Sequence, residues 1–482
     1  MASSNLNALN TALDVSPLRP LHWRIWGLSA MGVFIDGFDL FIIGVALPLV
    51  INQYKPGNVL IGLTVAAASL GALVGALFGG MITDRVGRKP IYVLDMLLVI
   101  IFCLGSACAW NMWSLAAMRF LLGLGIGADY PLCASYISEF IPARLRGRMI
   151  IAAFSFQAFG MLAAAAVGAL VLKLDPSMGD WRWMLGLPAA PAFVVLILRM
   201  GLPESARWYL EHGQFKKAAQ VVGLIVPEQK PQLVSLMEKE AQHIVEVEEK
   251  KLGYADLFSK KFRRRTLLAT VPWFLMDIST YGIGIFTPLI LTTFLASHAG
   301  VDGAATGAIA SDFRATEGAA FVDLFLILGF VLNICLVDHY GRIRLQIIGF
   351  AGMAAGLVLL SLAGARLEAQ QTPSMILVFL GFILFNVMMN LGPNATTFIL
   401  PAELFPTRIR ASGHGLAAGC AKLGATVGLF LLPIFKGRFG LVATLVGLTL
   451  VSLAALIVTV ATRIETAGRS LEDLHPGEAQ VD

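Results

Sequence analysis

An acid framed by aromatic hydrogen-bonding groups lies in the middle of an apolar stretch of the chain. Asp277 stands about twelve residues into a run long enough to cross a bilayer. Trp273, Asp277 and Tyr281 are spaced four residues apart, which places them within about 80° of one helix face. A carboxylate inside a membrane costs at least a few kcal/mol, so Asp277 is a candidate for substrate binding or proton transfer. The alternative is an acid that a neighbouring helix satisfies for packing alone.

Other polar residues are expected at the same depth. Counting 1.5 Å per residue from the polar connections places Asp129 and Asn394 about 15 Å into the membrane. Gln157 and Lys422 lie similarly deep, too deep for the lysine stem to reach the interface, although an amide such as Gln157 could serve only to join helices. The remaining candidates are Tyr130, the acids Asp36 and Asp39, and Asn386 and Asn390, which share a helix face with Asn394.

This set of groups suits a small oxyanion with several acceptor oxygens. Tyrosine, tryptophan and amide donors would bind the oxygens, and Lys422 would supply positive charge. An ionised Asp277 would repel an anion strongly in a low dielectric. A proton on Asp277 removes the repulsion and turns the acid into a donor, so proton and anion would bind together.

The whole chain has the composition of a multi-pass membrane protein. Apolar residues make up 57% of the 482 residues, charged residues only 14%, and the mean hydropathy is +0.76. Twelve apolar runs of spanning length predict an all-α membrane protein of twelve transmembrane helices in two six-helix bundles. The runs are 24–52, 60–82, 89–110, 112–138, 147–173, 182–202, 265–296, 319–337, 343–365, 374–400, 412–435 and 439–462. We therefore expect an N-terminal bundle at 1–202, a polar central segment with short helices at 203–264 and a C-terminal bundle at 265–482.

Lysine and arginine cluster in alternate connections, which predicts that both termini and the central segment are cytoplasmic. The net charge of +5 follows from this bias and does not indicate nucleic-acid binding. No cleavable signal sequence is evident at the N-terminus. The five cysteines all fall inside predicted spans, where they predict neither disulfides nor a metal site.

Two motifs occur once in each half of the chain. Asp84 and Arg88 after the second helix match Asp338 and Arg342 after the eighth, and Glu139 and Arg144 after the fourth match Glu403 and Arg408 after the tenth. A weaker match joins Glu204 after the sixth helix and Glu465 after the twelfth. Acids of this kind pair with arginine or accept N–H bonds at helix ends, so we expect gating contacts here unless they only shape the loops. Two parallel six-helix repeats are typical of rocking transporters.

These motifs resemble the signatures of the major facilitator superfamily, in the branch that holds sugar porters and phosphate symporters. The resemblance rests on Gly80 to Lys89, Pro203 to Trp208, Pro401 to Arg408 and Glu465 to Ser470, and it covers nearly the whole chain. Gly127 to Leu132, Trp273 to Gly282 and Gly392 to Phe398 resemble the phosphate:proton symporters in particular. That resemblance implies phosphate binding by Tyr130, Gln157, Trp273, Asp277, Tyr281 and Asn394, a proton path through Asp36, Asp39 and Asp129, and Lys422 steadying the anion or its empty site.

We therefore expect a monomeric, proton-coupled importer of phosphate in the plasma membrane or a bacterial inner membrane, with no cofactor or metal. One alternative is a carrier of a small organic anion or sugar on the same scaffold. A second is a nutrient sensor that binds without transport. An enzyme is not expected, because no metal set, nucleophile–base pair or nucleotide loop is visible.

Overall fold

The computed structural model describes residues 16–142, 144–174, 179–229, 231, 234–235, 253–284, 287, 305–372 and 374–469. Within those ranges every regular element is a helix, and ten segments are long and apolar enough to span a membrane. The predicted all-α membrane fold is confirmed. The rest of the seventh expected run, at 285–296, lies outside the described residues except for residue 287, and 1–15, 236–252 and the C-terminal 470–482 lie wholly outside them.

Contacts divide the chain into two compact units. Unit 1 comprises Met1–Ala269, Phe398–Gly419 and Thr466–Asp482, and unit 2 comprises Thr270–Thr397 and Cys420–Glu465. The ends of two helices from the second half of the sequence thus belong to unit 1. The domain boundaries expected at residues 202 and 264 stay a prediction of the sequence repeat.

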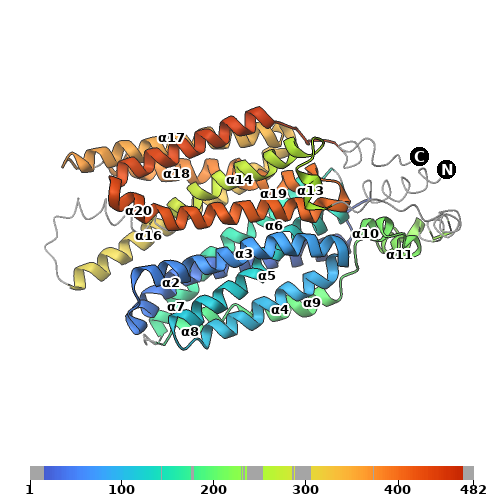
Figure 1. The fold of residues 1–482 in the computed structure, drawn as a ribbon, viewed down its shortest axis with the longest axis horizontal. Coiled ribbons are helices and arrows are strands. Elements are labelled where there is room, and N and C mark those ends of the chain that lie inside the picture. Colours follow the sequence, from blue (N-terminus) through green and yellow to red (C-terminus); the bar gives the residue numbers. More distant parts are fainter. Residues whose placement is uncertain are drawn as a thin grey trace. The chain divides into compact units, whose positions relative to one another are not determined.

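Unit 1 contains the first six spans (Figure 1). They are α2 (Pro20–Tyr54), α3 (Asn58–Val86), α4 (Arg88–Ala107), α5 (Met112–Phe140), α6 (Arg146–Phe154) with α7 (Phe156–Leu174), and α8 (Trp181–Gly186) with α9 (Ala189–Met200). Short helices follow at α10 (Ala206–Glu211), α11 (Phe215–Ile225), η1 (Pro227–Gln229) and α13 (Tyr254–Leu257). The fifth expected span is therefore interrupted at Ser155.

The later helices are α14 (Arg263–Gly284), α16 (Ala305–Tyr340), α17 (Arg342–Glu368), α18 (Met375–Leu391), α19 (Pro393–Leu404) and α20 (Thr407–Thr462). Gly392 (φ −115°, ψ −104°) interrupts the tenth expected span between α18 and α19. Two spans lie within α20, at Arg408–Leu432 and Phe435–Thr462. Gly440, near the start of the second, has φ +86°, which breaks the right-handed helical path.

Glycine allows α3 and α5 to pack backbone against backbone in unit 1. A Cβ on Gly75 would overlap the carbonyl oxygen of Leu124, and one on Gly127 would overlap that of Ala72. Small residues at helix contacts are the usual solution inside a bilayer, where lipid tails are as apolar as the side chains. The approach holds α5 deep in unit 1, with most of its residues buried.

We predict that Gly75→Ala destabilises the protein by about 1–3 kcal/mol, because the new methyl group forces α3 and α5 apart. Gly62→Ala is the matched control on α3, since a Cβ there meets no atom within 4 Å. It should leave stability unchanged or raise it by up to about 1 kcal/mol through helix propensity. Thermal unfolding of the purified variants in detergent measures the difference, and equal melting temperatures would contradict the packing argument.

Candidate functional site

Asp277, Tyr281 and Lys422 form one polar group in unit 2. Asp277 on α14 and Lys422 are 3% and 4% exposed, and Lys422 lies within the membrane span Arg408–Leu432. The Lys422 ammonium, on α20, donates to the Tyr281 hydroxyl at 3.2 Å and lies 5.3 Å from the centre of that ring. Lys422 is also the charged group that acts on Asp277. Trp273, one turn before Asp277 on α14, is buried.

Asn394 belongs to a chain of amides in the same unit. Its Nδ2 donates to Asn390 Oδ1 at 2.7 Å, and Asn390 Nδ2 donates to the carbonyl of Asn386 at 3.0 Å. Asn386 donates in turn to the carbonyl of Val322 on α16 at 3.1 Å. The expected stripe of three amides is thus a linked set, and only Asn394 at its end is partly exposed.

Tyr130 and Gln157 are brought together in unit 1. Gln157 Nε2 donates to the Tyr130 hydroxyl at 3.1 Å. The Tyr130 ring stacks on Phe398, with centroids 5.8 Å apart and planes 18° apart. A Cβ on Gly37 of α2 would overlap the Gln157 carbonyl oxygen, so this glycine is needed for the close approach of α2 to α7.

Both of these amides follow a break in a span. Gln157 is the second residue of α7 after the turn at Ser155, and Asn394 is the second residue of α19 after Gly392. Discontinuous helices of this kind accompany substrate sites in many transporters, because they leave backbone polar groups and side chains free to face a cavity. Of the two breaks, the one before Asn394 carries a local signal, the Gly392–Pro393 pair.

Asp129 lies in a buried ion cluster that sequence reasoning found only in part. Arg199 of α9 donates to Asp129 at 2.9 Å and 3.3 Å and to both carboxylate oxygens of Asp95 at 3.1 Å. Its guanidinium carbon lies 3.5 Å from the centre of the Tyr92 ring. All three charged side chains are fully buried. One cation faces two acids, so the fully ionised cluster would carry a net charge of −1 in a low dielectric.

Asp39 is paired with Arg119, across α2 and α5. Arg119 Nη1 donates to Asp39 Oδ1 at 2.6 Å, and both side chains are buried. Asp36, one turn earlier on α2, is also fully buried. Arg119, Arg199 and Asp95 were missed because charges near span ends look like topology signals. The signal that could have revealed them is charge balance, since each acid expected at membrane depth needs a cation at similar depth.

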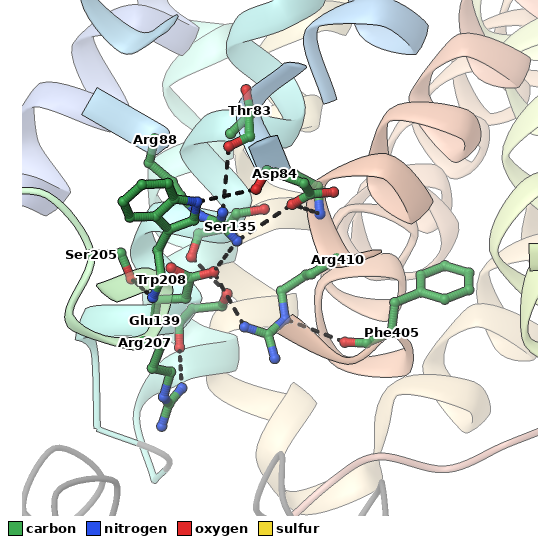
Figure 2. A network of polar contacts seen from close by, with 12 residues as sticks. Thr83, Asp84, Arg88, Ser135, Glu139, Ser205, Arg207, Trp208, Phe405 and Arg410 are labelled. Carbon is green, nitrogen blue, oxygen red and sulfur yellow. Dashed lines mark hydrogen bonds and ion pairs between the residues drawn. The ribbon is translucent and has the colours of Figure 1, made fainter. Parts of the chain in front are cut away.

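Three of the gating residues expected in the first half, Asp84, Arg88 and Glu139, form a charge cluster with Arg410 from the second half (Figure 2). Arg88 contacts Glu139 at 2.9 Å and Asp84 at 3.4 Å, and Arg410 contacts Glu139 at 3.4 Å. The partner of Glu139 is therefore not the neighbouring Arg144, which is exposed.

Asp84 also joins α3 to the start of α20. Its Oδ2 accepts from the backbone N–H and the hydroxyl of Ser412, each at 2.7 Å, and Oδ1 accepts from the N–H of Ala411 at 3.3 Å. The contact links a helix from the first half of the sequence to one from the second.

The equivalent motif in the second half makes the same local contacts within unit 2. Asp338 pairs with Arg342 at 3.1 Å. Glu465 accepts from the backbone N–H groups of Arg342 and Ile343 at 2.9 Å and 3.1 Å. In unit 1, Glu204 accepts from Arg88 and Lys89 in the same way, at 2.9 Å and 3.0 Å. A carboxylate at a helix N-terminus satisfies free N–H groups and the helix dipole, which explains the weak third match of the repeat.

Of the other expected gating residues, Glu403 makes a different contact. Glu403 of α19 accepts a hydrogen bond from the Thr466 hydroxyl. Arg408, near the start of α20, is partly buried.

Comparison with known proteins assigns the class. Solved structures of a xylose transporter from E. coli share the fold. The major facilitator superfamily proton:xylose symporter bound to 6-bromo-6-deoxy-D-glucose superposes with a TM-score of 0.76 at 21% identity, covering 94% of this chain and 98% of that one. The protein is therefore a multi-pass membrane protein of the major facilitator fold. The family model described as sugar (and other) transporter matches residues 28–477, and the chain belongs to this family.

Curated relatives cover almost the whole chain. The probable inorganic phosphate transporter 1-6 of Arabidopsis thaliana is 32% identical and covers 100% of this chain and 98% of its own length. The probable inorganic phosphate transporter 1-10 of Oryza sativa subsp. japonica is 34% identical over 87% of this chain and 81% of its own length. The family and these relatives consist of transporters, so the expectation that the protein is not an enzyme is confirmed.

The charge cluster should respond to pH through Glu211, at the end of α10. Burial and, to a smaller extent, the charge of Glu139 raise the pKa of Glu211 to about 8, against the opposing effects of Arg88, Arg410 and Arg408. The folded protein then holds a proton that the unfolded chain releases between pH 4.5 and about 8. Stability therefore falls as pH rises through this interval.

We predict that Glu211→Gln flattens the fall in melting temperature across that interval. Glu228→Gln is the control, because the side chain of Glu228 is 63% exposed and paired only with Arg19 at the surface. Melting curves in detergent across the pH range measure the slopes. If the melting temperature of Glu211→Gln fell with pH as steeply as that of the wild type, Glu211 would not be the cause of the pH dependence.

Proposed function

We propose that the protein is a proton-coupled importer of inorganic phosphate that works by alternating access. The observation that carries the proposal is the buried group of Asp277, Lys422 and Tyr281, which combines an acid, a cation and a phenol donor. Relatives named as inorganic phosphate transporters support the choice of anion. A buried acid next to a cation binds an anion best when the acid carries a proton, so one site accommodates both species.

In this proposal Asp277, Tyr281 and Lys422 bind the anion together with Trp273 and Asn394 from unit 2. The resemblance to phosphate:proton symporters also assigns phosphate binding to Tyr130 and Gln157, which belong to unit 1. Each of these groups can donate a hydrogen bond, provided that Asp277 is protonated. The partly exposed amides of Gln157 and Asn394 support this assignment, because each retains donor capacity beyond its observed hydrogen bond.

We assign proton coupling to Asp277, Asp129, Asp39 and Asp36. The cluster of Asp129 with Arg199 and Asp95 supports the assignment, since two acids around one buried cation favour retention of one proton. The pair of Asp39 with Arg119 balances its charge without a proton. A proton that reaches Asp39 would release Arg119, which is a change of charge that a conformational switch can use.

The transport cycle follows from these assignments. Asp277 takes a proton on the outside and the anion docks. Breaking the bonds of Asp84 to Ala411 and Ser412, and of Arg410 to Glu139, would open the gate on the cytoplasmic side. Loss of the proton to the more alkaline cytoplasm then restores the repulsion between Asp277 and the anion and expels the substrate.

We also propose that both termini are cytoplasmic, that the membrane is a plasma membrane or bacterial inner membrane, and that the protein acts as a monomer in the lipid bilayer. The orientation rests on the bias of lysine and arginine toward alternate connections.

Purified protein in liposomes with an imposed inward proton gradient should accumulate labelled phosphate, and unlabelled carboxylates or sugars in excess should not compete. Such a result follows because the site offers donors and one cation to a compact anion with several acceptor oxygens. Competition by an organic anion or a sugar would favour that substrate on the same scaffold. Phosphate binding without counterflow would indicate a sensor.

Asp277→Asn should retain phosphate exchange but lose accumulation driven by the proton gradient. Asparagine keeps a neutral donor at this position and cannot release a proton. Asp256→Asn is a control on the polar connection before α14, where the carboxylate only accepts from the N–H of Gly253. Undiminished uphill transport by Asp277→Asn would rule out the coupling role of this acid.

A further inference from the structure

Asn394 lies directly after a break that leaves its helix weakly constrained by its own backbone. Gly392 lies outside helical geometry, and Pro393 has no N–H to donate to the preceding turn. A continuous helix fixes the direction of each side chain through its hydrogen-bond ladder. At α19 that ladder lacks the bond from Pro393, although the N–H groups of Gly392 and Thr396 still donate to Met388 and Gly392 at 3.1 Å and 3.0 Å. Contacts from other helices therefore help to set the rotation of α19.

Helix α17 packs directly onto the break. A Cβ on Gly349 would overlap Pro393 Cδ, and one on Gly392 would overlap the carbonyl oxygen of Leu345. The two glycines bring the backbones of α17 and the break into contact. This close packing fixes the distance between α17 and α19. Contact through glycine backbone has no side chain to interlock, so it does not fix the rotation of α19 about its own axis.

A buried relay of side chains supplies the rotational constraint. The hydroxyl of Thr396 on α19 donates to Gln346 Oε1 on α17 at 2.8 Å, a shorter distance than those to the carbonyl oxygens of Gly392 and Pro393, at 3.1 Å and 3.5 Å. Gln346 Nε2 donates to the hydroxyl of Thr459 on α20 at 3.0 Å. All three side chains are 0% exposed. An unsatisfied amide at such depth would cost about 1–3 kcal/mol, so any rotation that separates Thr396 from Gln346 is opposed.

The orientation of the Asn394 amide is set from α18. Asn390 Oδ1 accepts one of the two Nδ2 hydrogens of Asn394, while Asn390 itself is held by the carbonyl of Asn386. Asn390 is fully buried. The second Nδ2 hydrogen is the one that would form a hydrogen bond to an oxyanion.

We propose that Gln346, Thr396 and Asn390 are positioning residues that hold the Asn394 amide ready to donate to an oxyanion. This inference rests on the proposed function, since it requires Asn394 to bind the transported anion. Thr396 and Asn394 are two residues apart on α19, so a small rotation that breaks the Thr396 bond displaces the amide as well. Preorganisation of this kind lowers the cost of binding without adding a contact to the substrate.

The test compares Thr396→Val with Thr396→Ser in proteoliposomes, using labelled inorganic phosphate. Valine keeps the shape of threonine and removes the hydroxyl, whereas serine keeps the hydroxyl. We expect valine to raise the KM for phosphate roughly three- to tenfold with little change in maximal rate, and serine to restore the wild-type value. Thr449→Val on α20 is the control, because its buried hydroxyl donates only to the Leu445 carbonyl of its own helix.

Two further variants keep the test decisive. Gln346→Met removes both relay bonds while preserving length, and it replaces Thr396→Val if the latter does not fold. Combined with Asn394→Ala, either variant should cause no loss beyond that of Asn394→Ala alone. An unchanged KM, failure of serine to restore it, or additive losses in the double variant would overturn the positioning role. Absence of saturable phosphate uptake by the wild type would instead defeat the proposed function, and the inference with it.

Discussion

A charge removed from water needs a partner, and this requirement explains the positions of most polar residues inside both units. Moving an isolated ion from water into a low dielectric costs more free energy than the net stability of a typical folded protein. In unit 1, Asp39 forms an ion pair with Arg119, and Asp129 forms one with Arg199. In both pairs the two residues lie on different helices. In unit 2, Lys422 supplies the charge that acts on Asp277. Each pairing therefore also determines which helices must be neighbours.

Helix α5 makes most of these pairings in unit 1. It provides Arg119 to α2, Asp129 to α9 and Glu139 to the charge cluster, and glycine allows it to contact α3 along the backbone. A helix that is held on several sides cannot shift without exchanging ion pairs. Protonation of an acid changes the charge of one pairing at a time, which is how a proton can bias a rigid bundle toward another arrangement.

The fold and several site residues could be predicted from the sequence, because apolar length and polar residues at depth are local signals. Asp129, Asp277 and Lys422 could be proposed as candidates because a charge within an apolar run is rare and costly. Arg199 and Asp95 were missed, because charges near span ends also occur for topology. Arg88 and Arg410, rather than Arg144, proved to be the partners of Glu139, and the pairing with Arg410 depends on how helices from the two halves of the sequence meet. No periodicity in the sequence carries that information.

The most direct test of proton-coupled phosphate import is to follow internal pH in proteoliposomes that are loaded with a pH-sensitive dye and given no initial gradient. External phosphate should acidify the interior in step with uptake of the label, and an ionophore that dissipates the pH change should increase total uptake. Phosphate entry without acidification beyond that of protein-free liposomes would contradict the account.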